Sequence, residues 1–583
     1  MARPQFGPLI GANGVTFRLW APAARSVSLI IDKPHDMERH GEWFALQVPQ
    51  ARPGTRYRFK IDDELEIPDP ASHFQPEDVH GASEVIDRRY DWQCKNWKGR
   101  PWHEAVFSEA HVGAFTEQGT FQAAIGKLDH LAATGITALE LMPLADFPGR
   151  WNWGYDGVLP FAPDSAYGRP EDLKALIDAA HARGLMVFLD VVYNHFGPEG
   201  NYLHRIAPTF FCDAHTPWGG AINYERPEVR AFAIENALHW LDHYRFDGLR
   251  LDAVHAIVTP GEPHVLHDLS AAVGELAART GRHIHLVLEN DDNVASLLAP
   301  QEEPPAGRYR AQWNDDYHHA WHVLLTHEEQ GYYRDYKASE KQVERVLADG
   351  FAYQGDPSPH REGKPRGEPS RDLPRAAFVN FIQNHDQIGN RPLGERLTGL
   401  AEPAALEAAL AVLLLQPSPP LLFMGEEWGA AEPFPFFCDF KGDLAEAVRQ
   451  GRKREFAEAY ARHGDEIPDP LAPETYRRAK LDWQALAQPA HGRRLALVRA
   501  LLETRRRHVA PLLPAITKAG EAKHFDRVLS ARWIAGDRTL MLLANLSGTG
   551  QTCPDISWGT AIWGETPGAQ LVAWSVHAAV GDR

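Results

Sequence analysis

The sequence predicts a multidomain α/β protein in which a (β/α)8 TIM barrel lies between an N-terminal immunoglobulin-like β-sandwich and a small C-terminal β domain. Three observations predict this fold class. Apolar residues alternate with period two near the start, apolar runs then alternate with amphipathic segments, and short alternating runs return at the end. Because the period changes twice along the chain, we expect three structural units.

The first unit covers residues 1–90. Apolar residues alternate there in four runs that are separated by Gly, Pro and Asp, as in short antiparallel strands. The runs are 15–19, 27–31, 44–48 and 57–61. We expect a β-sandwich, followed by a polar linker at residues 91–104.

The second unit covers residues 105–512 and alternates between two kinds of segment. Short runs that are apolar throughout are typical of buried parallel strands, and they lie at 106–115, 136–144, 185–193, 248–254, 284–289, 310–314, 377–383 and 420–425. Segments with helical periodicity lie at 120–135, 170–184, 227–245, 265–280, 317–326, 340–350, 403–416 and 491–508. Eight strands with helices between most of them predict the barrel.

Two stretches depart from the regular alternation. The fifth helix is weak, because residues 295–309 are short and Pro-rich, and residues 431–490 are an irregular excursion before the last helix. Residues 513–583 return to short alternating runs, such as 539–545 and 571–576, and predict the C-terminal β domain.

Composition limits the function. The 583 residues carry a formal net charge of −18, which argues against nucleic acid or an anionic membrane as the main partner. The four cysteines are far apart, so neither a disulfide framework nor a CxxC metal site is expected. The start of the chain lacks a signal-peptide pattern, and no run of about 18 apolar residues could span a membrane. We therefore expect a cytoplasmic protein.

Polar side chains gather where the predicted barrel strands end, which is where barrel enzymes place their active sites. The strand-end residues are Asp190, Asn194, His195, Arg250, Asp252, His255, Glu289, Asn290, Asp291, Asn384, His385, Asp386 and Gln387. One acidic residue at a strand end is usually a solvated loop residue or a helix cap. Asp252, Glu289 and Asp386 are expected at the same end of the barrel, where their charges repel one another. Their clustering therefore favours a functional role over solvated loop residues or helix caps.

A retaining glycosidase uses two carboxyl groups about 5 Å apart. One attacks the anomeric carbon, and the other protonates the leaving oxygen and must keep its proton near neutral pH. Arg250 lies two residues before Asp252 on the same strand, faces the same way and can keep Asp252 ionised. Asp190 is better explained as a structural partner of Arg250.

Four strand-end segments, DVVYNH, GLRLDAVH, LEND and QNHD, resemble in the right order the conserved segments of the α-amylase clan, glycoside hydrolase family 13. The resemblance implies that Asp252 is the nucleophile, Glu289 the general acid/base and Asp386 a stabiliser of the transition state. It also implies a glucose subsite shaped by His195, Arg250 and His385, with Tyr155 of WGYDG stacking beneath the sugar. His195 and Tyr155 each retain a simpler reading as buried structural residues.

Within the clan, four stretches resemble the maltooligosyltrehalose trehalohydrolase subfamily: EAHVGAFTEQGTF (109–121), RWNWGYDGVLPFAP (150–163), RFDGLRLDAVHAI (245–257) and QWNDDYHHAWHVLLT (312–326). The resemblance implies cleavage of the α-1,4 bond next to a terminal trehalose unit, with release of trehalose. The trehalose contacts are then expected at His255, Trp313, Asn314, Asp315, Asp316 and Trp218, and Gln387 is a further expected substrate-binding residue. Trp313 also fits ordinary core packing.

Two alternatives stay open: a branching or debranching glucan enzyme of the same clan, and a non-catalytic carbohydrate-binding protein, which the intact acidic triad disfavours. No cofactor is expected. Asn194 occupies a calcium-ligating position of many amylases, but the accompanying acidic loop pattern is not evident, so we expect no metal. A synthase that makes the trehalose-capped chain is the expected pathway partner.

Overall fold

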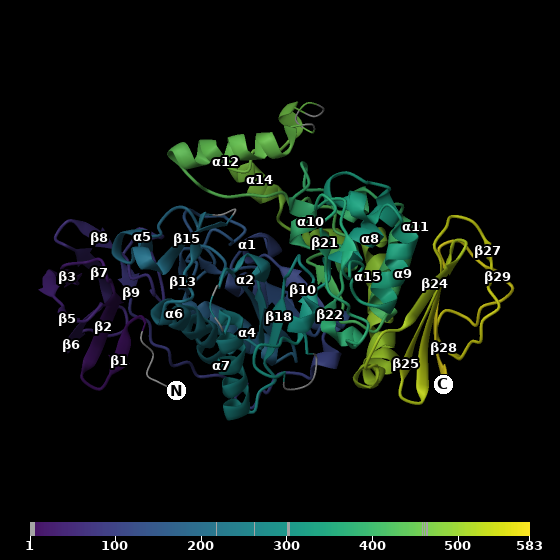
Figure 1. The fold of residues 1–583 in the computed structure, drawn as a ribbon, viewed down its shortest axis with the longest axis horizontal. Coiled ribbons are helices and arrows are strands. Elements are labelled where there is room, and N and C mark those ends of the chain that lie inside the picture. Colours follow the sequence, from purple (N-terminus) through teal and green to yellow (C-terminus); the bar gives the residue numbers. More distant parts are fainter. Residues whose placement is uncertain are drawn as a thin grey trace.

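A computed structural model describes residues 6–583 except 217–218, 260, 262, 300–303, 458, 460 and 462–463. Three bodies follow one another along the longest axis: an N-terminal β-sandwich, a central barrel and a C-terminal β-sheet (Figure 1). The predicted fold class is confirmed. We retain the domain limits 1–90, 91–104, 105–512 and 513–583 as a proposal.

The N-terminal sandwich consists of two antiparallel sheets. One has the order β1 (Leu9–Gly11), β2 (Gly14–Trp20), β6 (Trp43–Val48), β5 (Glu38–His40). The other has the order β4 (Pro34–Asp36), β3 (Val27–Ile30), β7 (Arg56–Ile61), β8 (Leu65–Ile67), with β9 (Ser83–Glu84) also paired to β7. The four alternating runs of the sequence form β2, β3, β6 and β7, because period-two residues all reach one face of a strand.

Eight parallel strands form the barrel, and each coincides with one of the predicted apolar runs. In sequence order they are β10 (Phe107–Ala110), β11 (Ala138–Leu141), β14 (Met186–Val191), β17 (Gly248–Leu251), β18 (His285–Leu288), β19 (Ala311–Trp313), β22 (Phe378–Val379) and β23 (Leu421–Phe423). Every residue of these strands is buried, which explains why the runs are apolar on both faces.

The barrel closes between β22 and β23 through a single isolated bridge. Asn380 and Pro420 pair there in parallel: the Asn380 N–H donates to the Pro419 carbonyl at 2.9 Å, and the Leu421 N–H donates to the Asn380 carbonyl at 2.8 Å. Proline has no N–H to extend the ladder. Buried amide side chains also meet at this seam, since Asn314 donates to Asn380 at 2.9 Å.

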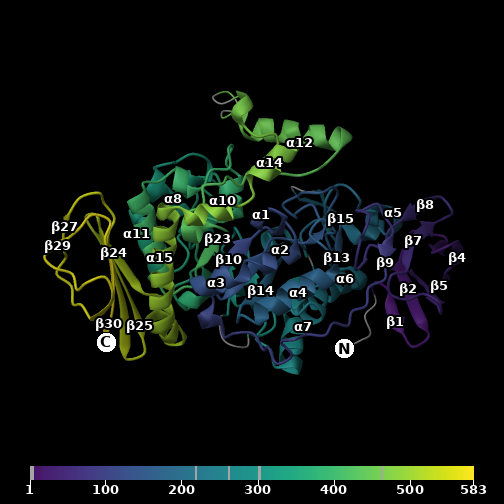
Figure 2. The ribbon, with the colours of Figure 1, turned by 180° about the vertical axis from the view of Figure 1, so that it is seen from behind.

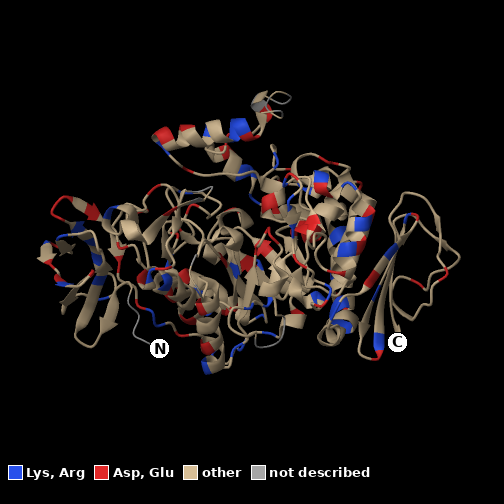
Figure 3. Ribbon diagram, in the orientation of Figure 1, with Lys and Arg blue, Asp and Glu red and all other residues tan. Residues whose placement is uncertain are grey.

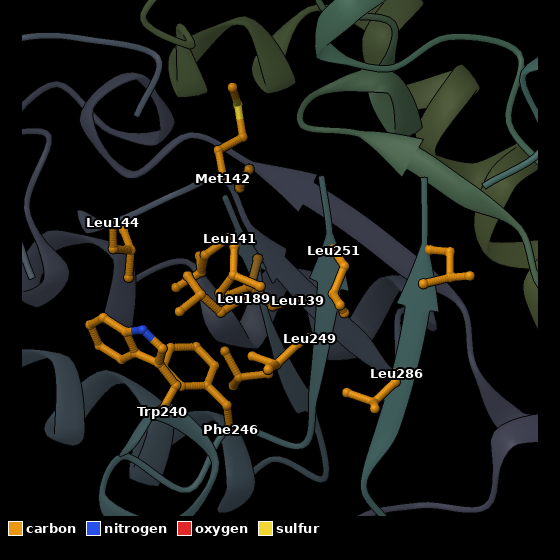
Figure 4. Packing of buried hydrophobic residues seen from close by; sticks show 14 of the residues in the cluster. Leu139, Leu141, Met142, Leu144, Leu189, Trp240, Phe246, Leu249, Leu251 and Leu286 are labelled. Carbon is orange, nitrogen blue, oxygen red and sulfur yellow. The ribbon is translucent and has the colours of Figure 1, made fainter. Parts of the chain in front are cut away.

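Helices cover the outside of the barrel (Figure 2). They are α2 (Phe121–Ile125), α3 (Leu128–Thr134), α4 (Pro170–His181), α6 (Pro227–Leu238), α7 (Val265–Thr280), α8 (Asp315–Thr326), α9 (Ser339–Ala348), α11 (Pro403–Leu415) and α15 (Pro489–Thr504). In the described part of the weak fifth helix, which excludes residues 300–303, the structure has the short turn Ala295–Leu297. Between strands and helices the core is continuous, as where Leu189 and Leu249 meet Trp240 and Phe246 (Figure 4).

The C-terminal sheet is antiparallel, with the order β24 (Glu521–Phe525), β25 (Val528–Ala535), β26 (Arg538–Asn545), β30 (Val576–Asp582), β28 (Thr560–Trp563). It packs on the barrel helices α9 and α11, and the Trp533 indole donates to the Leu347 carbonyl at 3.0 Å. A small pair, β27 (Gln551–Thr552) and β29 (Gln570–Leu571), lies at its side.

The irregular region 431–490 contains α12 (Gly442–Glu455), which projects above the barrel (Figure 1). Asp443 stands in its first turn and Arg452, Lys453 and Arg454 in its last, an order that complements the helix dipole (Figure 3). Across the described ranges, no helix combines the length and apolar character needed to cross a bilayer.

Candidate active site

Arg250, at the end of β17, stands at the centre of the candidate site and is fully buried. Its guanidinium contacts Asp190 at 2.8 Å and Asp252 at 2.7 Å through one nitrogen, and Glu289 at 3.2 Å through another. Two of the predicted catalytic carboxylates therefore share one cation, which draws them together in the same small volume.

The backbone after Asp252 makes a tight turn that ties Asp252 to Glu289. Ala253 has a φ of 41°, in the left-handed region that non-glycine residues rarely adopt. In this conformation the Ala253 N–H donates to the Glu289 carboxylate at 2.7 Å. The Asn194 amide donates to the Asp252 carboxylate at 2.8 Å, so both carboxylates are held in fixed orientations.

Burial raises the pKa of two carboxyl groups beside Arg250. Desolvation raises the pKa of Glu289 well above its usual value, and repulsion from Asp252 and Asp386 adds to this, although Arg250 opposes it. Burial also raises the pKa of Asp190, to about 7. The shift at Glu289 favours its protonated form, which is the form that an acid catalyst requires.

Asp386 and His385 lie in the first turn of α10 (His385–Gly389), after β22. The side chain of Asn384 caps this helix and accepts from the Asp386 N–H at 2.9 Å. Desolvation opposes ionisation of Asp386, but the charge of His385, 3.3 Å away, outweighs it and lowers the Asp386 pKa. Desolvation likewise opposes the charge on His385, yet Asp386 and Glu109 together raise the His385 pKa well above its usual value.

Tyr155 lies beside these groups on the WGYDG turn. Its hydroxyl donates to Asp190 at 2.6 Å and lies 2.9 Å from His385 Nε2, and its ring stacks on the His385 ring with centroids 5.2 Å apart. Gly154 has a φ of 104°, and a Cβ there would lie 2.2 Å from the Pro143 carbonyl oxygen, so this turn requires glycine. His195 Nε2 donates to the Tyr155 carbonyl at 3.0 Å.

A cavity of about 210 Å³ opens beside Glu289 and Asp386. The other lining residues come from the ends of β18, α8 and α10 and from the segment after α8: Asp291, Asp315, His319, Tyr332, Asp335, Tyr336, Ser358, His360, Arg361, Arg366, Gln387 and Asn390. The cavity combines aromatic rings with carboxylates and guanidinium groups, the mixture that a sugar requires.

Asp315, which was predicted for the leaving-group side, and Gln387, which was predicted to bind substrate, both line this cavity, and Gln387 donates to Asp315 at 3.3 Å. Burial, with repulsion from Asp291 and Asp386, raises the pKa of Asp315 to about 7. His255 is exposed and accepts from the Asp291 N–H at 3.3 Å, at the edge of the same region. Trp218 lies outside the described residues.

Asn314 and Asp316 are both fully buried, and neither is among the residues that line this cavity. Asp316 accepts from Arg366, Asn293 and the backbone N–H groups of Ala352 and Tyr353. Asn314 belongs to the seam described above. The cause is helical geometry: consecutive residues at the start of α8 point about 100° apart, so one of them faces the cavity and its neighbours face the core.

Trp313 is 1% exposed, and its ring lies 4.3 Å from the Arg250 guanidinium carbon. It therefore packs against Arg250 from within the barrel, a position consistent with the core-packing interpretation.

Sequence reasoning did not select several residues that the structure brings to the site. Glu109 in β10 is a buried carboxylate in contact with His385. It is a charged residue inside an apolar run, and that signal could have identified it. Arg361 and Arg366, which contact Asp291 at 2.6 and 2.9 Å, come from a segment without periodicity and gave no such signal.

Asn194 uses its amide to hold Asp252. Within the described part of the chain, no group of three His, Cys, Asp or Glu side chains is arranged to hold a metal ion.

Comparisons with known proteins identify families and solved structures that this chain resembles. A family model described as the alpha amylase catalytic domain matches residues 94–210, and one described as carbohydrate-binding module 48 (isoamylase N-terminal domain) matches residues 5–72. A crystal structure from Salmonella typhimurium superimposes with a TM-score of 0.94 at 45% identity, over 99% of both chains. A pullulanase from Paenibacillus barengoltzii shares the fold, with a TM-score of 0.72 at 20% identity.

Several curated relatives carry the name malto-oligosyltrehalose trehalohydrolase. The protein from Deinococcus radiodurans is 42% identical, over 92% of this chain and 88% of its own length. That from Saccharolobus solfataricus is 41% identical, over 82% and 84%, and that from Mycobacterium tuberculosis is 37% identical, over 96% and 98%. At this identity and coverage, the chain belongs to the malto-oligosyltrehalose trehalohydrolase family of α-amylase-type glycoside hydrolases.

Proposed function

We propose that this enzyme hydrolyses the α-1,4-glucosidic bond next to the terminal trehalose unit of maltooligosyltrehalose and releases trehalose by a retaining double displacement. The observation that carries the proposal is the contact of one guanidinium, that of Arg250, with both Asp252 and Glu289. Carboxylates held together in this way suit the separation of about 5 Å in retaining enzymes better than the larger gap of inverting ones.

In the first displacement, a carboxylate oxygen of Asp252 attacks the anomeric carbon on the non-reducing side of the scissile bond. The bond from that carbon to the glycosidic oxygen breaks, and its electron pair stays on the oxygen. Glu289, protonated because burial raises its pKa, transfers its proton to that oxygen, and trehalose leaves.

In the second displacement, water attacks the same carbon and Glu289, now ionised, takes the water proton. The bond to Asp252 breaks with its electron pair returning to the carboxylate, so both groups regain their starting forms. Asp386, ionised beside His385, stabilises the positive charge that develops on the sugar in both steps.

The cavity beside Glu289 suits the leaving trehalose. It begins at the proton donor, and its wall offers Tyr332, Arg361 and Asp315 as an aromatic ring, a donor and an acceptor. A pocket built to bind the turned 1,1-linked glucose leaves polar groups unpaired when a straight chain occupies it.

The test is a product assay on maltopentaosyl-trehalose, maltohexaose and amylopectin. We expect free trehalose from the capped chain and a kcat/KM at least about 100-fold above that for maltohexaose. Equal rates on the two short chains would replace the proposal with a general glucan hydrolase, and new or lost branches in amylopectin would replace it with a branching or debranching enzyme.

We also propose that the enzyme works in the cytoplasm, downstream of a synthase that caps malto-oligosaccharides with trehalose. All four cysteines, Cys94, Cys212, Cys438 and Cys553, are free thiols, as a reducing compartment favours.

A further inference from the structure

His385 lies between acidic groups on both sides of its ring. Its Nδ1 is in hydrogen-bond contact with a carboxylate oxygen of Glu109, and its backbone N–H donates to the other oxygen at 3.1 Å. On the far side, Nε2 lies 3.3 Å from Asp386 and 2.9 Å from the Tyr155 hydroxyl. The His385 and Glu109 side chains are each 1% exposed, so water cannot replace these contacts.

We propose that Glu109 is a positioning residue for hydrolysis: it keeps the His385 ring doubly protonated and fixed in orientation, and through that ring it keeps Asp386 ionised and in place. The inference rests on the proposed function and adds a residue that does not touch the sugar.

A neutral imidazole carries one N–H and can donate on one side only, whereas the imidazolium donates on both. His385 has a carboxylate at each nitrogen, and both contacts are satisfied only when both nitrogens carry protons. Without the charge of Glu109, burial would favour the neutral ring, and Asp386 would lose the cation that offsets its own desolvation.

Other titratable groups also face His385. They are Glu140 in β11, Asp190 in β14, His111 after β10, and Tyr155 and Asp386 in the loops above. Of the carboxylates among them, only Asp386 is in direct contact with the ring, so Glu109 alone serves Nδ1 in the part of the chain that the structure describes.

Glu140 provides a matched control because it faces Glu109 directly in the β10–β11 register. Burial, with repulsion from Glu109, raises the pKa of Glu140 well above its usual value, which favours its neutral form. Neither of its carboxyl oxygens has a hydrogen-bond partner among the described residues. Replacing it by glutamine therefore keeps the neutral form that burial favours and removes no hydrogen bond at His385.

The experiment compares kcat/KM on the capped chain from pH 5 to pH 9 for wild type, Glu109→Gln, Glu109→Asp and Glu140→Gln. In Glu109→Gln the pKa of His385 falls toward its ordinary value of about 6.5, so the ring is protonated only at acidic pH. The loss relative to wild type should be small at pH 5 and reach about 10-fold or more at pH 8. Glu109→Asp keeps the charge, so any loss should be independent of pH, and Glu140→Gln should follow wild type.

A double-mutant cycle separates positioning from a structural role. If Glu109 acts through His385, Glu109→Gln costs nothing further in a His385→Gln background. A pH-independent loss in Glu109→Gln, or full additivity in the cycle, overturns the proposal, provided that circular dichroism shows folded variants. Failure of the proposed function is distinguishable, because it appears as a different substrate preference of the wild type. The activity ratios of the Glu109 variants to wild type can then be measured on whichever α-1,4-glucan the wild type cleaves.

Discussion

At the scale of single residues, the two acids with assigned chemistry contribute little to the core. Asp252 and Glu289 have side chains that are 12% and 17% exposed and face the mouth of the barrel. Asp252→Asn and Glu289→Gln should each lower kcat by at least about 10³-fold, because each removes a group used in bond formation or proton transfer.

Steady-state kinetics and thermal unfolding of the purified variants check this expectation. Glu275→Gln, an exposed carboxylate on α7, serves as the control and should retain wild-type kinetics. More than a tenth of wild-type kcat in either folded active-site variant would refute the assignment.

Asp315 and Asp316 are neighbours with opposite surroundings. Asp315→Ala should fold normally and lower kcat/KM on the capped chain by about 10- to 100-fold, because it removes a polar group from the cavity wall. Asp316→Ala should destabilise the fold by about 3 kcal/mol or more, because it leaves Arg366 and two backbone N–H groups without their buried partner.

The unfolding midpoints and the activities of the two variants are compared on capped chain and maltohexaose. Similar unfolding midpoints for the two variants would contradict the assignment of Asp316 to the core.

The pH dependence of kcat/KM follows from two opposite pKa shifts. The pKa of Glu289 is raised, so its catalytic proton is present at neutral pH and is lost only as the pH rises through that value. The pKa of Asp386 is lowered, so its charge persists until the pH falls below its usual range near 4. We expect a broad plateau around neutrality, and measurement of kcat/KM from pH 3 to pH 10 checks it. A maximum confined to pH 4–5 would show that Glu289 is not the acid.

At the scale of elements, the period of apolar residues predicts whether a segment is a strand or a helix better than it predicts which of its residues face the site. The eight barrel strands could be predicted because each is buried on both faces, as Val187 and Leu189 in β14 illustrate. The side of α8 on which Asp315 and Asp316 lie could not be predicted, since it depends on where α8 begins. The positions of Arg361 and Arg366 could not be predicted either, because long-range ion pairs and not a local period bring them to Asp291.

The helix α11 shows how an element can depend on a neighbouring domain. Apart from Glu407 it is apolar around its circumference, and from Leu410 to Leu415 every residue is buried. The barrel and α15 cover part of it, and β26 and β30 of the C-terminal sheet cover the rest. The sheet therefore completes the barrel core and is not an independent appendage.

A chain ending at residue 516 should consequently aggregate when expressed, because the exposed face of α11 becomes a contiguous apolar patch. Soluble yield and size-exclusion chromatography measure this. The control is full-length Val572→Ser, which changes a residue that is already 72% exposed and should stay soluble. A soluble, monodisperse truncated chain would show that the sheet is dispensable.

At the scale of the whole molecule, stereochemistry depends on the assembled barrel, because Asp252 and Glu289 come from different strands and meet at Arg250. Retention predicts that the new reducing end first appears as the α-anomer. Proton NMR during early hydrolysis of the capped chain records it. If the β-anomer appears first, Asp252 is not a covalent nucleophile.

The one-bridge seam between β22 and β23 has a consequence for synthesis. While the chain emerges from the ribosome, seven strands precede β23, and until Leu421–Phe423 arrive they form an open sheet with free edges at β10 and β22. The stretch still to come includes α11, which is apolar apart from Glu407. At about 5–20 residues per second this state lasts for seconds, with two unpaired edges and an uncovered helix. We therefore expect nascent chains of this enzyme to be chaperone clients chiefly between the translation of β22 and that of the C-terminal sheet.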